Sequence, residues 1–424
     1  MKMVLSKQQT DIVMSDAKNI IVDAAAGSGK TRVLVERVRR LLNNGADPSS
    51  FVVITFTNEA ANELKSRLSD ICNSDKCFIG TIHSYAHKLL KKFGFDFEIF
   101  SEYYQTEYMN YLIKKYALYC TFDDYLDFLK YDKLAVSGKI SRSSIQSKFS
   151  DTKIYSELMQ LLGRVPSSYY KETVLTLCKA NNVISFDELI ELSTKYFSES
   201  DTSVGYLFVD ELQDIGYLEY SFLMSLNAAN NFVIGDDYQA IFGFKGGDVN
   251  IFLSLMENKD WTSFTLSENY RTAKSILNYA NSIIKKADNI ISKDVICKNS
   301  NVGELSFIAK SQLDKFLSKL NADEQWFILA RSNREMNMIS IALSKMNKNH
   351  YCFKRSVSNS STYDAVKNKN CIVVMTIHAA KGLESERVAI YGKFKADAKD
   401  MDSDEIKVYY VALTRAKNKC VVFV

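Results

Sequence analysis

The chain has 424 residues, of which 46% are hydrophobic and 25% are charged, and its formal net charge is +4. This is the composition of an ordinary globular protein with room for two or three domains of about 100–200 residues each. A membrane span needs about 18 consecutive apolar residues, and the sequence has no such run and no signal-peptide pattern at its N-terminus. Its eight cysteines are scattered without zinc or redox spacing, so we expect free thiols and a cytoplasmic protein.

Short apolar runs rich in β-branched residues occur at 19–23, 51–57, 77–83, 206–211 and 231–237. Polar or glycine residues follow each run, and a helical pattern comes next. Continuous apolar runs are typical of buried parallel strands, and their alternation with helices favours right-handed β-α-β units. The first part of the chain therefore predicts an α/β parallel sheet.

Residues between about 90 and 200 are rich in Tyr, Leu and Lys at helical spacing, which predicts a helical insertion in the first lobe. A second group of strands is expected from near 264 onward, with runs at 326–332, 371–378, 387–392 and 420–424. The expected plan is two α/β lobes. Its parts are a first lobe in two pieces (1–92 and 183–265), the insertion (93–182) and a second lobe (266–424).

The first apolar run leads into a loop of small residues, and residues 20–31 read IIVDAAAGSGKT. Ala24 and the tripeptide 29–31 satisfy the phosphate-loop pattern. Small residues let backbone N–H groups surround a phosphate, and the helix that begins at Lys30 adds its positive end. Lys30 is then expected to reach the β- and γ-phosphates, and the Thr31 hydroxyl to bind Mg²⁺. The alternative interpretation is a glycine-rich turn that binds no ligand.

A phosphate loop needs a carboxylate for the metal and a group that orients water. Asp210 and Glu211 follow the apolar run at 206–209, at the end of a predicted strand. Asp210 can hold Mg²⁺ while Glu211 polarises the attacking water. Taken alone, an Asp-Glu pair there is commonly a solvated strand end, but the phosphate loop favours the catalytic interpretation.

Further segments follow in a fixed order: LSKQQ (5–9), ITFTNEAANELKSRL (54–68), GTIHSYAHKLL (80–90), DELQD (210–214), VIGDDYQAIFGFKGGD (233–248), LSENYRT (266–272), MTIHAAKGLES (375–385) and YYVALTRAK (409–417). These strings resemble the Q motif and motifs Ia, Ib and II to VI of the UvrD/Rep/PcrA group of superfamily 1 DNA helicases. The resemblance implies two RecA-like lobes, ATP and Mg²⁺ as cofactors, and single-stranded DNA and its junctions with duplex as partners. It also implies a bacterial or phage-infected cell.

The resemblance also implies roles for single residues. Gln9 would read adenine, Tyr270 would stack on it, and Gln239 would sense the γ-phosphate. Arg271 and Arg415 would reach that phosphate from the far lobe, Arg415 as an arginine finger, with Lys381 near phosphate and Glu384 near the ribose. The remaining nucleotide-binding candidates are Ala24, Ala25, Gly27, Ser28, Gly29, Arg32 and Gly382.

Motifs Ia, Ib and III imply a DNA track, because single strands are held by backbone charge and by stacking on aromatic rings. The candidates are Thr55, Phe56, Asn58, Thr81, His83, Phe242, Phe244 and Lys245. Phe242, Phe244 and Lys245 stand where the family usually has Tyr, Trp and Arg, which predicts a weaker grip per base. Phe56 and His83 have an alternative interpretation as core residues.

Only about a hundred residues separate the segments ending at 272 and beginning at 375, too few for the family's large accessory subdomain. We also expect no counterpart of the tail that relatives carry beyond motif VI. The first hypothesis is an ATP-dependent single-stranded DNA translocase and helicase that moves 3′ to 5′. The second is a nucleotide-gated DNA-binding ATPase subunit of a nuclease or phage-defence complex. A third hypothesis is a small-molecule kinase. Besides DNA, the expected partner is a nuclease or a replication or repair protein.

Overall fold

The computed structural model describes residues 4–71, 76–99, 119–121, 124, 127–128, 131, 141–149, 153–158, 183–200, 203–321, 324–354, 371–398 and 401–424. The chain forms two compact units. The first comprises Met1–Ile82 and Thr202–Val424, and the second comprises His83–Asp201. The second unit contains the predicted insertion, 93–182, together with residues that the sequence analysis gave to the first lobe. The lobe boundaries therefore stay predictions.

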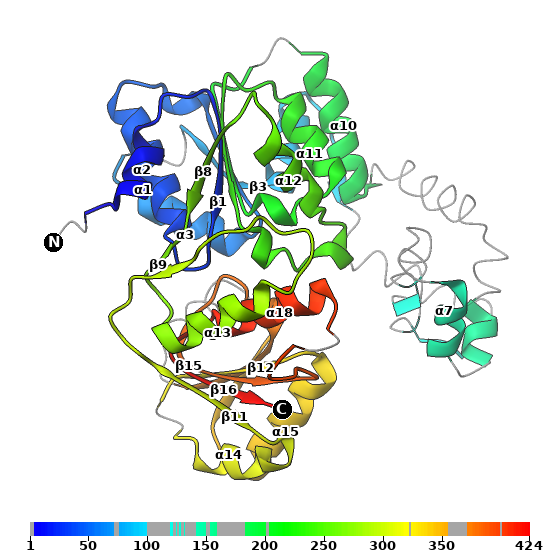
Figure 1. Ribbon diagram of the computed structural model, residues 1–424. Coiled ribbons are helices and arrows are strands. Elements are labelled where there is room, and N and C mark those ends of the chain that lie inside the picture. The colour runs from blue at the N-terminus through cyan, green and yellow to red at the C-terminus, as the bar shows by residue number, and fades with distance from the viewer. Residues whose placement is uncertain are drawn as a thin grey trace. The chain divides into compact units, whose positions relative to one another are not determined.

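The first unit holds a six-stranded sheet whose strands all run parallel (Figure 1). Its order is β3 (Phe78–Thr81), β2 (Phe51–Thr55), β6 (Tyr206–Asp210), β7 (Asn230–Gly235), β1 (Asn19–Ala24) and β8 (Thr262–Leu266). Helices α1 (Lys7–Met14), α2 (Lys30–Asn43) and α3 (Asn58–Leu68) cover one face, and α11 (Tyr217–Ser225) and α12 (Val249–Glu257) lie on the other. Val33, Leu34 and Val38 of α2 belong to the buried core on this face of the sheet, together with residues of β1 and β7.

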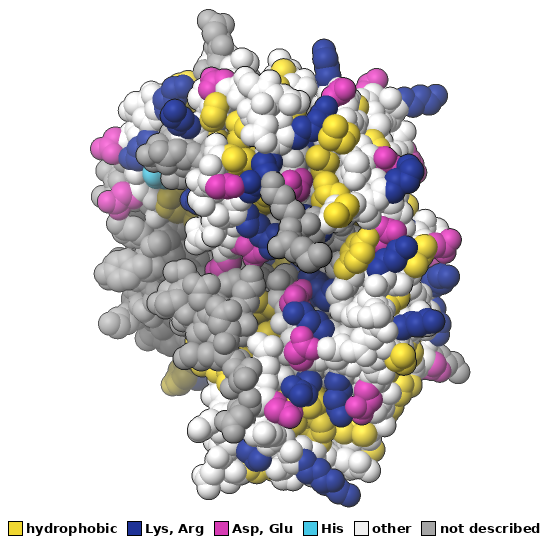
Figure 2. Space-filling view, turned by 90° about the vertical axis from the view of Figure 1, so that its left-hand side faces the viewer, with side chains coloured by type: hydrophobic (Ala, Val, Ile, Leu, Met, Phe, Trp, Pro, Cys, Tyr) yellow, Lys and Arg dark blue, Asp and Glu magenta, His cyan; other side chains and the backbone are white. Residues whose placement is uncertain are grey.

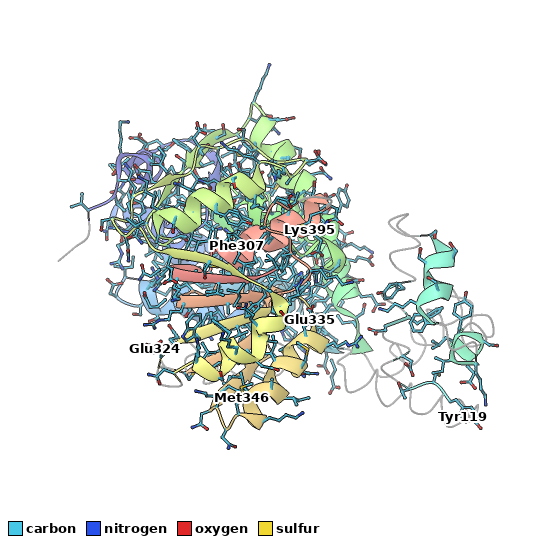
Figure 3. All side chains as sticks on the ribbon, turned by 60° about the horizontal axis from the view of Figure 1, so that its bottom comes forward. Tyr119, Phe307, Glu324, Glu335, Met346 and Lys395 are labelled. Atoms are coloured by element: carbon cyan, nitrogen blue, oxygen red, sulfur yellow. The ribbon has the colours of Figure 1, made fainter. Side chains whose placement is uncertain are left out.

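A second six-stranded parallel sheet follows in the same unit. Its order is β11 (Glu304–Ile308), β16 (Ala416–Phe423), β15 (Ser385–Tyr391), β12 (Trp326–Ala330), β14 (Ile372–Thr376) and β13 (His350–Phe353). Helices α13 (Lys274–Ile284) and α18 (Ser403–Leu413) form a core on one face, and α14 (Leu313–Lys319) and α15 (Asn333–Lys345) form a core on the other (Figures 1 and 3). The prediction of an α/β protein with two parallel-sheet lobes is confirmed.

Within the two six-stranded sheets, three strands differ from the sequence expectation. β8, near residue 264, was expected to open the second strand group, but it pairs with β1 in the first sheet. β11 and β13 were not predicted, because both are edge strands of the second sheet whose residues are mostly partly exposed. Without a continuous apolar run, such strands leave little signal in the sequence.

The second unit contains most of α4 (Ile82–Lys92), together with α7 (Arg142–Lys148) and α10 (Phe186–Ser198). It also holds a short parallel pair, β4 (Glu98–Ile99) with β5 (Val183–Ile184). Among the described residues, none of the helices is both long and apolar enough to cross a membrane. Five of the described cysteines have free thiols, as expected: Cys120, Cys297, Cys352, Cys371 and Cys420. Cys77 is disulfide-bonded, contrary to that expectation.

Candidate active site

The phosphate loop connects β1 to α2 at the carboxyl edge of the first sheet, where parallel α/β sheets commonly bind ligands. Gly27 and Gly29 have φ values of 69° and 89°, which favour glycine. A Cβ atom on Gly27 would lie 2.7 Å from Cβ of Arg271, and one on Gly29 would lie 2.8 Å from Nε2 of Gln9. The loop is therefore tightly enclosed by other parts of the site.

Two polar atoms of this loop suit a phosphate. Lys30 Nζ and Ser28 Oγ are buried, and neither has a hydrogen-bond partner among the described residues. The nearest carboxylate oxygen to Lys30 Nζ is Oε2 of Glu211, at 3.6 Å. Because unpaired buried polar groups are costly, a triphosphate in the loop would satisfy both atoms. The residues present thus fit the nucleotide that the sequence implies.

Asp210 ends β6, and Glu211 follows in a left-handed backbone conformation with φ 57°. Burial and the adjacent Glu211 raise the pKa of Asp210 above its ordinary value. Burial acts to raise the pKa of Glu211, but Lys30, Lys381, Gln213 and Arg415 together outweigh burial and hold that pKa below the ordinary range. Gln213 Nε2 donates a hydrogen bond to Oε2 of Glu211 at 2.6 Å. The result is an ionised, oriented Glu211 carboxylate beside the phosphate loop, and it would become a stronger base once the Lys30 cation turned from it to a phosphate.

The second lobe contributes cations to the same place. Arg415, between α18 and β16, is 1% exposed and donates to Oε1 of Gln239 at 2.8 Å. Lys381 Nζ donates to the carbonyl oxygen of Gln239 at 2.6 Å and forms an ion pair with Asp214. Gln239 of the first lobe is therefore held on both sides by second-lobe cations.

The segment after β8 also contacts the phosphate loop. Asn269 Nδ2 donates to the carbonyl oxygen of Ala26 at 2.6 Å, and the Tyr270 N–H donates to that of Gly27 at 3.0 Å. Arg271 forms an ion pair with Glu384, which also pairs with Lys417 at 3.0 Å. Burial acts to raise the pKa of Glu384, but Arg271 and Lys417 together lower it to about 2.

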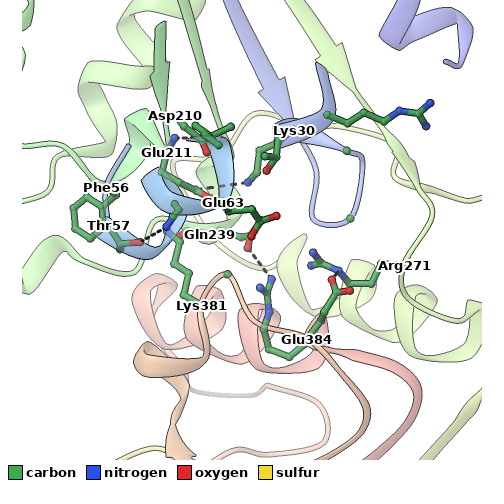
Figure 4. Close-up of a pocket in the computed structure, with 18 of the residues that line it drawn as sticks. Lys30, Phe56, Thr57, Glu63, Asp210, Glu211, Gln239, Arg271, Lys381 and Glu384 are labelled. Atoms are coloured by element: carbon green, nitrogen blue, oxygen red, sulfur yellow. Dashed lines mark hydrogen bonds and ion pairs between the residues drawn. The ribbon is translucent and has the colours of Figure 1, made fainter. Parts of the chain in front are cut away.

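Most of these charged groups line one cavity of about 490 Å³ (Figure 4). Phosphate-loop residues and carboxylates of the first lobe meet cations of the second lobe across it. The predicted nucleotide-site residues on its wall are Gly27, Gly29, Lys30, Thr31, Arg32, Asp210, Glu211, Gln239, Arg271, Lys381, Gly382, Glu384 and Arg415, and two predicted DNA contacts, Phe56 and Phe242, also line it. Lys30 and Arg415 thus face a shared cleft, as the two-lobe hypothesis requires.

The two predicted adenine contacts differ from the rest. Gln9 is 3% exposed, and its Nε2 donates to the carbonyl oxygen of Ser28 at 3.0 Å. Its Oε1 accepts from the N–H of Ser6 at 3.1 Å, so both polar ends of Gln9 are engaged within the protein. Tyr270 is 45% exposed, and its hydroxyl donates to Glu268 at 2.7 Å. In this structure Gln9 supports the phosphate loop, and the Tyr270 ring is accessible to a base.

The predicted DNA contacts divide by burial. Thr55 and Phe242 are 1% and 3% exposed, which argues against direct contact of either side chain with DNA. Phe56 stacks on Phe242 with ring centroids 5.2 Å apart and packs against the core, as its alternative interpretation allows. Phe244 is 54% exposed, and Lys245 is also exposed.

The remaining three candidates lie elsewhere. Asn58 is exposed at the start of α3, and Thr81 ends β3. His83 lies in the second unit, where its ring meets Phe186 edge-on at 4.9 Å. On the described part of the face in Figure 2, Lys and Arg side chains are interspersed with Asp and Glu.

Several residues of the site were missed by the sequence analysis. Asp214, Asn269 and Lys417 each stand inside a quoted motif, so their neighbours carried the signal. His378 lies edge-on to Phe244 at 5.2 Å and also stands in a motif. Ala60, Glu63, Leu64 and Arg67 of α3 also line the cavity, and they stand inside the quoted segment 54–68.

Residues 5–260 match the model of the UvrD/REP helicase N-terminal domain, and residues 353–424 match that of the UvrD-like helicase C-terminal domain. A probable DNA helicase of Mycoplasma pneumoniae is 27% identical over 97% of this chain and 82% of its own length. The ATP-dependent DNA helicase PcrA of Bacillus subtilis is 27% identical over 88% of this chain, and DNA helicase II of Escherichia coli is 26% identical over 80%. The chain covers 53% and 50% of those two proteins.

Proposed function

Because the chain belongs to the UvrD/REP helicase family, we propose that it hydrolyses ATP to move along single-stranded DNA, 3′ to 5′, and to separate duplexes. The observation that carries this proposal is the shared cavity, with Lys30 and Glu211 on one lobe and Arg415 on the other. Positive charges on the second lobe are attracted to the γ-phosphate bound on the first lobe, and this attraction favours a closed cleft. Cleavage and release of that phosphate remove the attraction, so the cleft can open. Such a two-state element is what a motor needs.

Residues of the first lobe would carry out the chemistry. Lys30 would leave its 3.6 Å contact with Glu211 and bind the β- and γ-phosphates. Glu211 would then be free to accept a proton from the attacking water, with Gln213 fixing its orientation. Thr31 and Asp210 both line the cavity and would hold Mg²⁺, which supplies neutralisation of phosphate charge.

Residues of the second lobe would sense the reaction. Arg415 donates to Gln239 in this structure, and both side chains lie on the cavity wall. Arg415 would act as the finger that stabilises transition-state charge, and Gln239 would report its position to the segment that carries Phe244. Arg271 would shift from its ion pair with Glu384 to the γ-phosphate.

The first test is the rate of ATP hydrolysis with and without single-stranded DNA, at about 50 and 200 mM salt. We expect DNA to stimulate turnover and salt to weaken that stimulation steeply, because binding to phosphates releases counterions. Turnover that ignores DNA at both salt concentrations would contradict the proposal and favour a small-molecule kinase.

A second test separates a motor from a nucleotide-gated DNA-binding subunit. The protein is loaded on DNA that carries streptavidin at one end, and displacement of streptavidin is followed with ATP present. A 3′-to-5′ motor displaces streptavidin only from the 5′ end. The matched control is Glu211→Gln, which should bind ATP but stall, because the group that accepts the proton is gone. Displacement by this variant, or none by the parent protein, would contradict directional movement.

A further inference from the structure

Lys293 is a buried cation outside every motif named above. It lies on the connection between α13 and β10 (Ile296–Cys297), and its side chain is 1% exposed. Its Nζ contacts three carboxylates: Asp23, Asp236 at 2.8 Å and Asp237 at 2.7 Å. Buried lysines are rare unless paired, and this one is surrounded by acidic groups.

The three carboxylates come from two neighbouring strands. β1 and β7 pair in parallel with Asp23 opposite Gly235, so Asp236 and Asp237 follow at the same edge of the sheet. β1 continues directly into the phosphate loop, and β7 continues into the 3-10 turn Asp237–Gln239. Lys293 thus joins the starting points of both active-site segments of the first lobe.

The connection that carries Lys293 makes other contacts with that turn. The N–H of Ile291 donates to Oδ2 of Asp237 at 2.6 Å, and the N–H of Lys293 donates to the Tyr238 hydroxyl at 3.1 Å. Lys293 Nζ also lies 4.1 Å from the centre of the Tyr238 ring. The backbone N–H groups of Ile291 and Lys293 therefore hold two side chains of the turn, in addition to the charge on Lys293.

Asp236 links Lys293 to the catalytic groups. Its Oδ2 accepts from Nε2 of Gln239 at 2.5 Å, and Gln239 in turn accepts from Arg415. Its backbone N–H donates to Oε1 of Gln213 at 2.9 Å, and Gln213 holds Glu211. A displacement of Asp236 would therefore reach both the proposed base and the proposed arginine finger.

Removing the cation would disturb this arrangement electrostatically. Burial raises the pKa of Asp23 to about 7, and the nearby carboxylates of Asp236 and Asp237 contribute to this rise. Lys293 opposes the rise without cancelling it. Burial also opposes ionisation of Asp236, but Lys293 keeps its pKa below the ordinary value. Without Lys293 the buried carboxylates would repel one another or take up protons, and breaking a buried ion pair is strongly unfavourable.

We propose that Lys293 is a positioning residue for ATP hydrolysis, which fixes Asp236 and thereby sets Gln239 for contact with Arg415. This inference rests on the proposed ATPase function. It assigns Lys293 no contact with the nucleotide.

The experiment measures kcat and KM for ATP with saturating single-stranded DNA in Lys293→Met, Gln239→Ala and the combined variant. Lys293→Met should lower kcat by about 10- to 100-fold and change KM by less than about 3-fold, because Lys293 serves the transition state through Gln239. In the Gln239→Ala background the same substitution should cost less than about 3-fold, since residues acting as a unit are not additive. Equal losses in both backgrounds would overturn the proposal.

The matched control is Arg37→Met, which removes another buried cation whose hydrogen bonds, within the described part of the chain, go to the carbonyl oxygens of Ile12, Val13 and Ser15. It should lower the melting temperature and leave kcat per folded molecule unchanged. If Lys293→Met does not fold, Asp23→Asn and Asp237→Asn are added to it, which leaves one carboxylate and a smaller buried charge. Full turnover in that triple variant would overturn the proposal, and a lowered kcat with normal KM would support it.

The ATPase activity of the unsubstituted protein distinguishes failure of the proposed function from failure of the inference about Lys293. A parent without ATPase activity overturns the proposed function and this inference together. An active parent whose kcat is unaffected by Lys293→Met overturns this inference alone.

Discussion

The nucleotide cleft and the candidate DNA track differ in how well their predicted residues converge. In the cleft, groups as distant in the chain as Lys30, Glu211 and Arg415 line one cavity. In the track, Phe242 is buried in the core while Phe244 is 54% exposed. The difference has a physical origin. A phosphate loop and each charged motif can be recognised from residue types at short spacing along the chain, whereas a stacking ring works only where packing leaves its face open.

The largest expected effect is that of Lys30→Ala. The substitution removes the cation that the loop directs at the phosphates, so ATP turnover should fall at least about 100-fold. Phosphate release with saturating DNA is the measurement. Lys7→Ala, which removes an exposed lysine paired with Asp11, should leave the rate unchanged. Substantial turnover by Lys30→Ala would show that the cavity is not the catalytic site.

Arg415→Ala tests the far side of the cleft. We expect a loss in kcat of about 100-fold with ATP affinity within a few-fold of the parent, because a finger acts mainly in the transition state. Arg415 also donates to the carbonyl oxygens of Leu383 and Val411, so melting temperatures must be compared as well. Arg415→Lys keeps the charge without the fork and should recover only part of the rate. Equal losses in binding and turnover would argue against a finger.

Phe244→Ala and Phe242→Ala sharpen the comparison within the track. Loss of the exposed Phe244 ring should weaken single-stranded DNA binding by about 1–3 kcal/mol and leave stability unchanged. Loss of the buried Phe242 ring should reduce the free energy of unfolding by about 3–5 kcal/mol. Fluorescence anisotropy with labelled DNA and chemical denaturation give the two readouts. The assignment fails if the two variants exchange these phenotypes.

The smallest expected effect concerns pH and His378. Burial, with Arg331, Lys245 and Lys381 nearby, lowers the pKa of His378 from 6.5 to about 4. Between these values the unfolded chain binds more protons than the folded protein, so His378 makes the protein less stable as pH falls from 6.5 toward 4. Between pH 7 and 5, His378→Asn should reduce the fall in melting temperature by about 1–3 °C. An unchanged or larger fall in the variant would contradict the lowered pKa.

The strands show how far the sequence predicts the fold. Continuous apolar runs such as 51–55 and 372–376 predicted central strands, because burial on both faces leaves no polar positions. The edge strand Glu304–Ile308 escaped prediction, because its residues are largely half-exposed. Burial thus governs which strands can be read from sequence alone.

By itself, the sequence determined the phosphate loop, the carboxylates Asp210 and Glu211 at the end of β6, and the order of the motifs, because these depend on residue type and on short-range spacing. Tertiary structure alone decided that Gln239 accepts from Arg415, that Gln9 supports the loop, and that Phe242 is buried two residues before an exposed Phe244. It also brought Lys293 to the carboxylates at the ends of β1 and β7. These pairings join segments that lie far apart along the chain, and only the packing of both sheets brings them into contact.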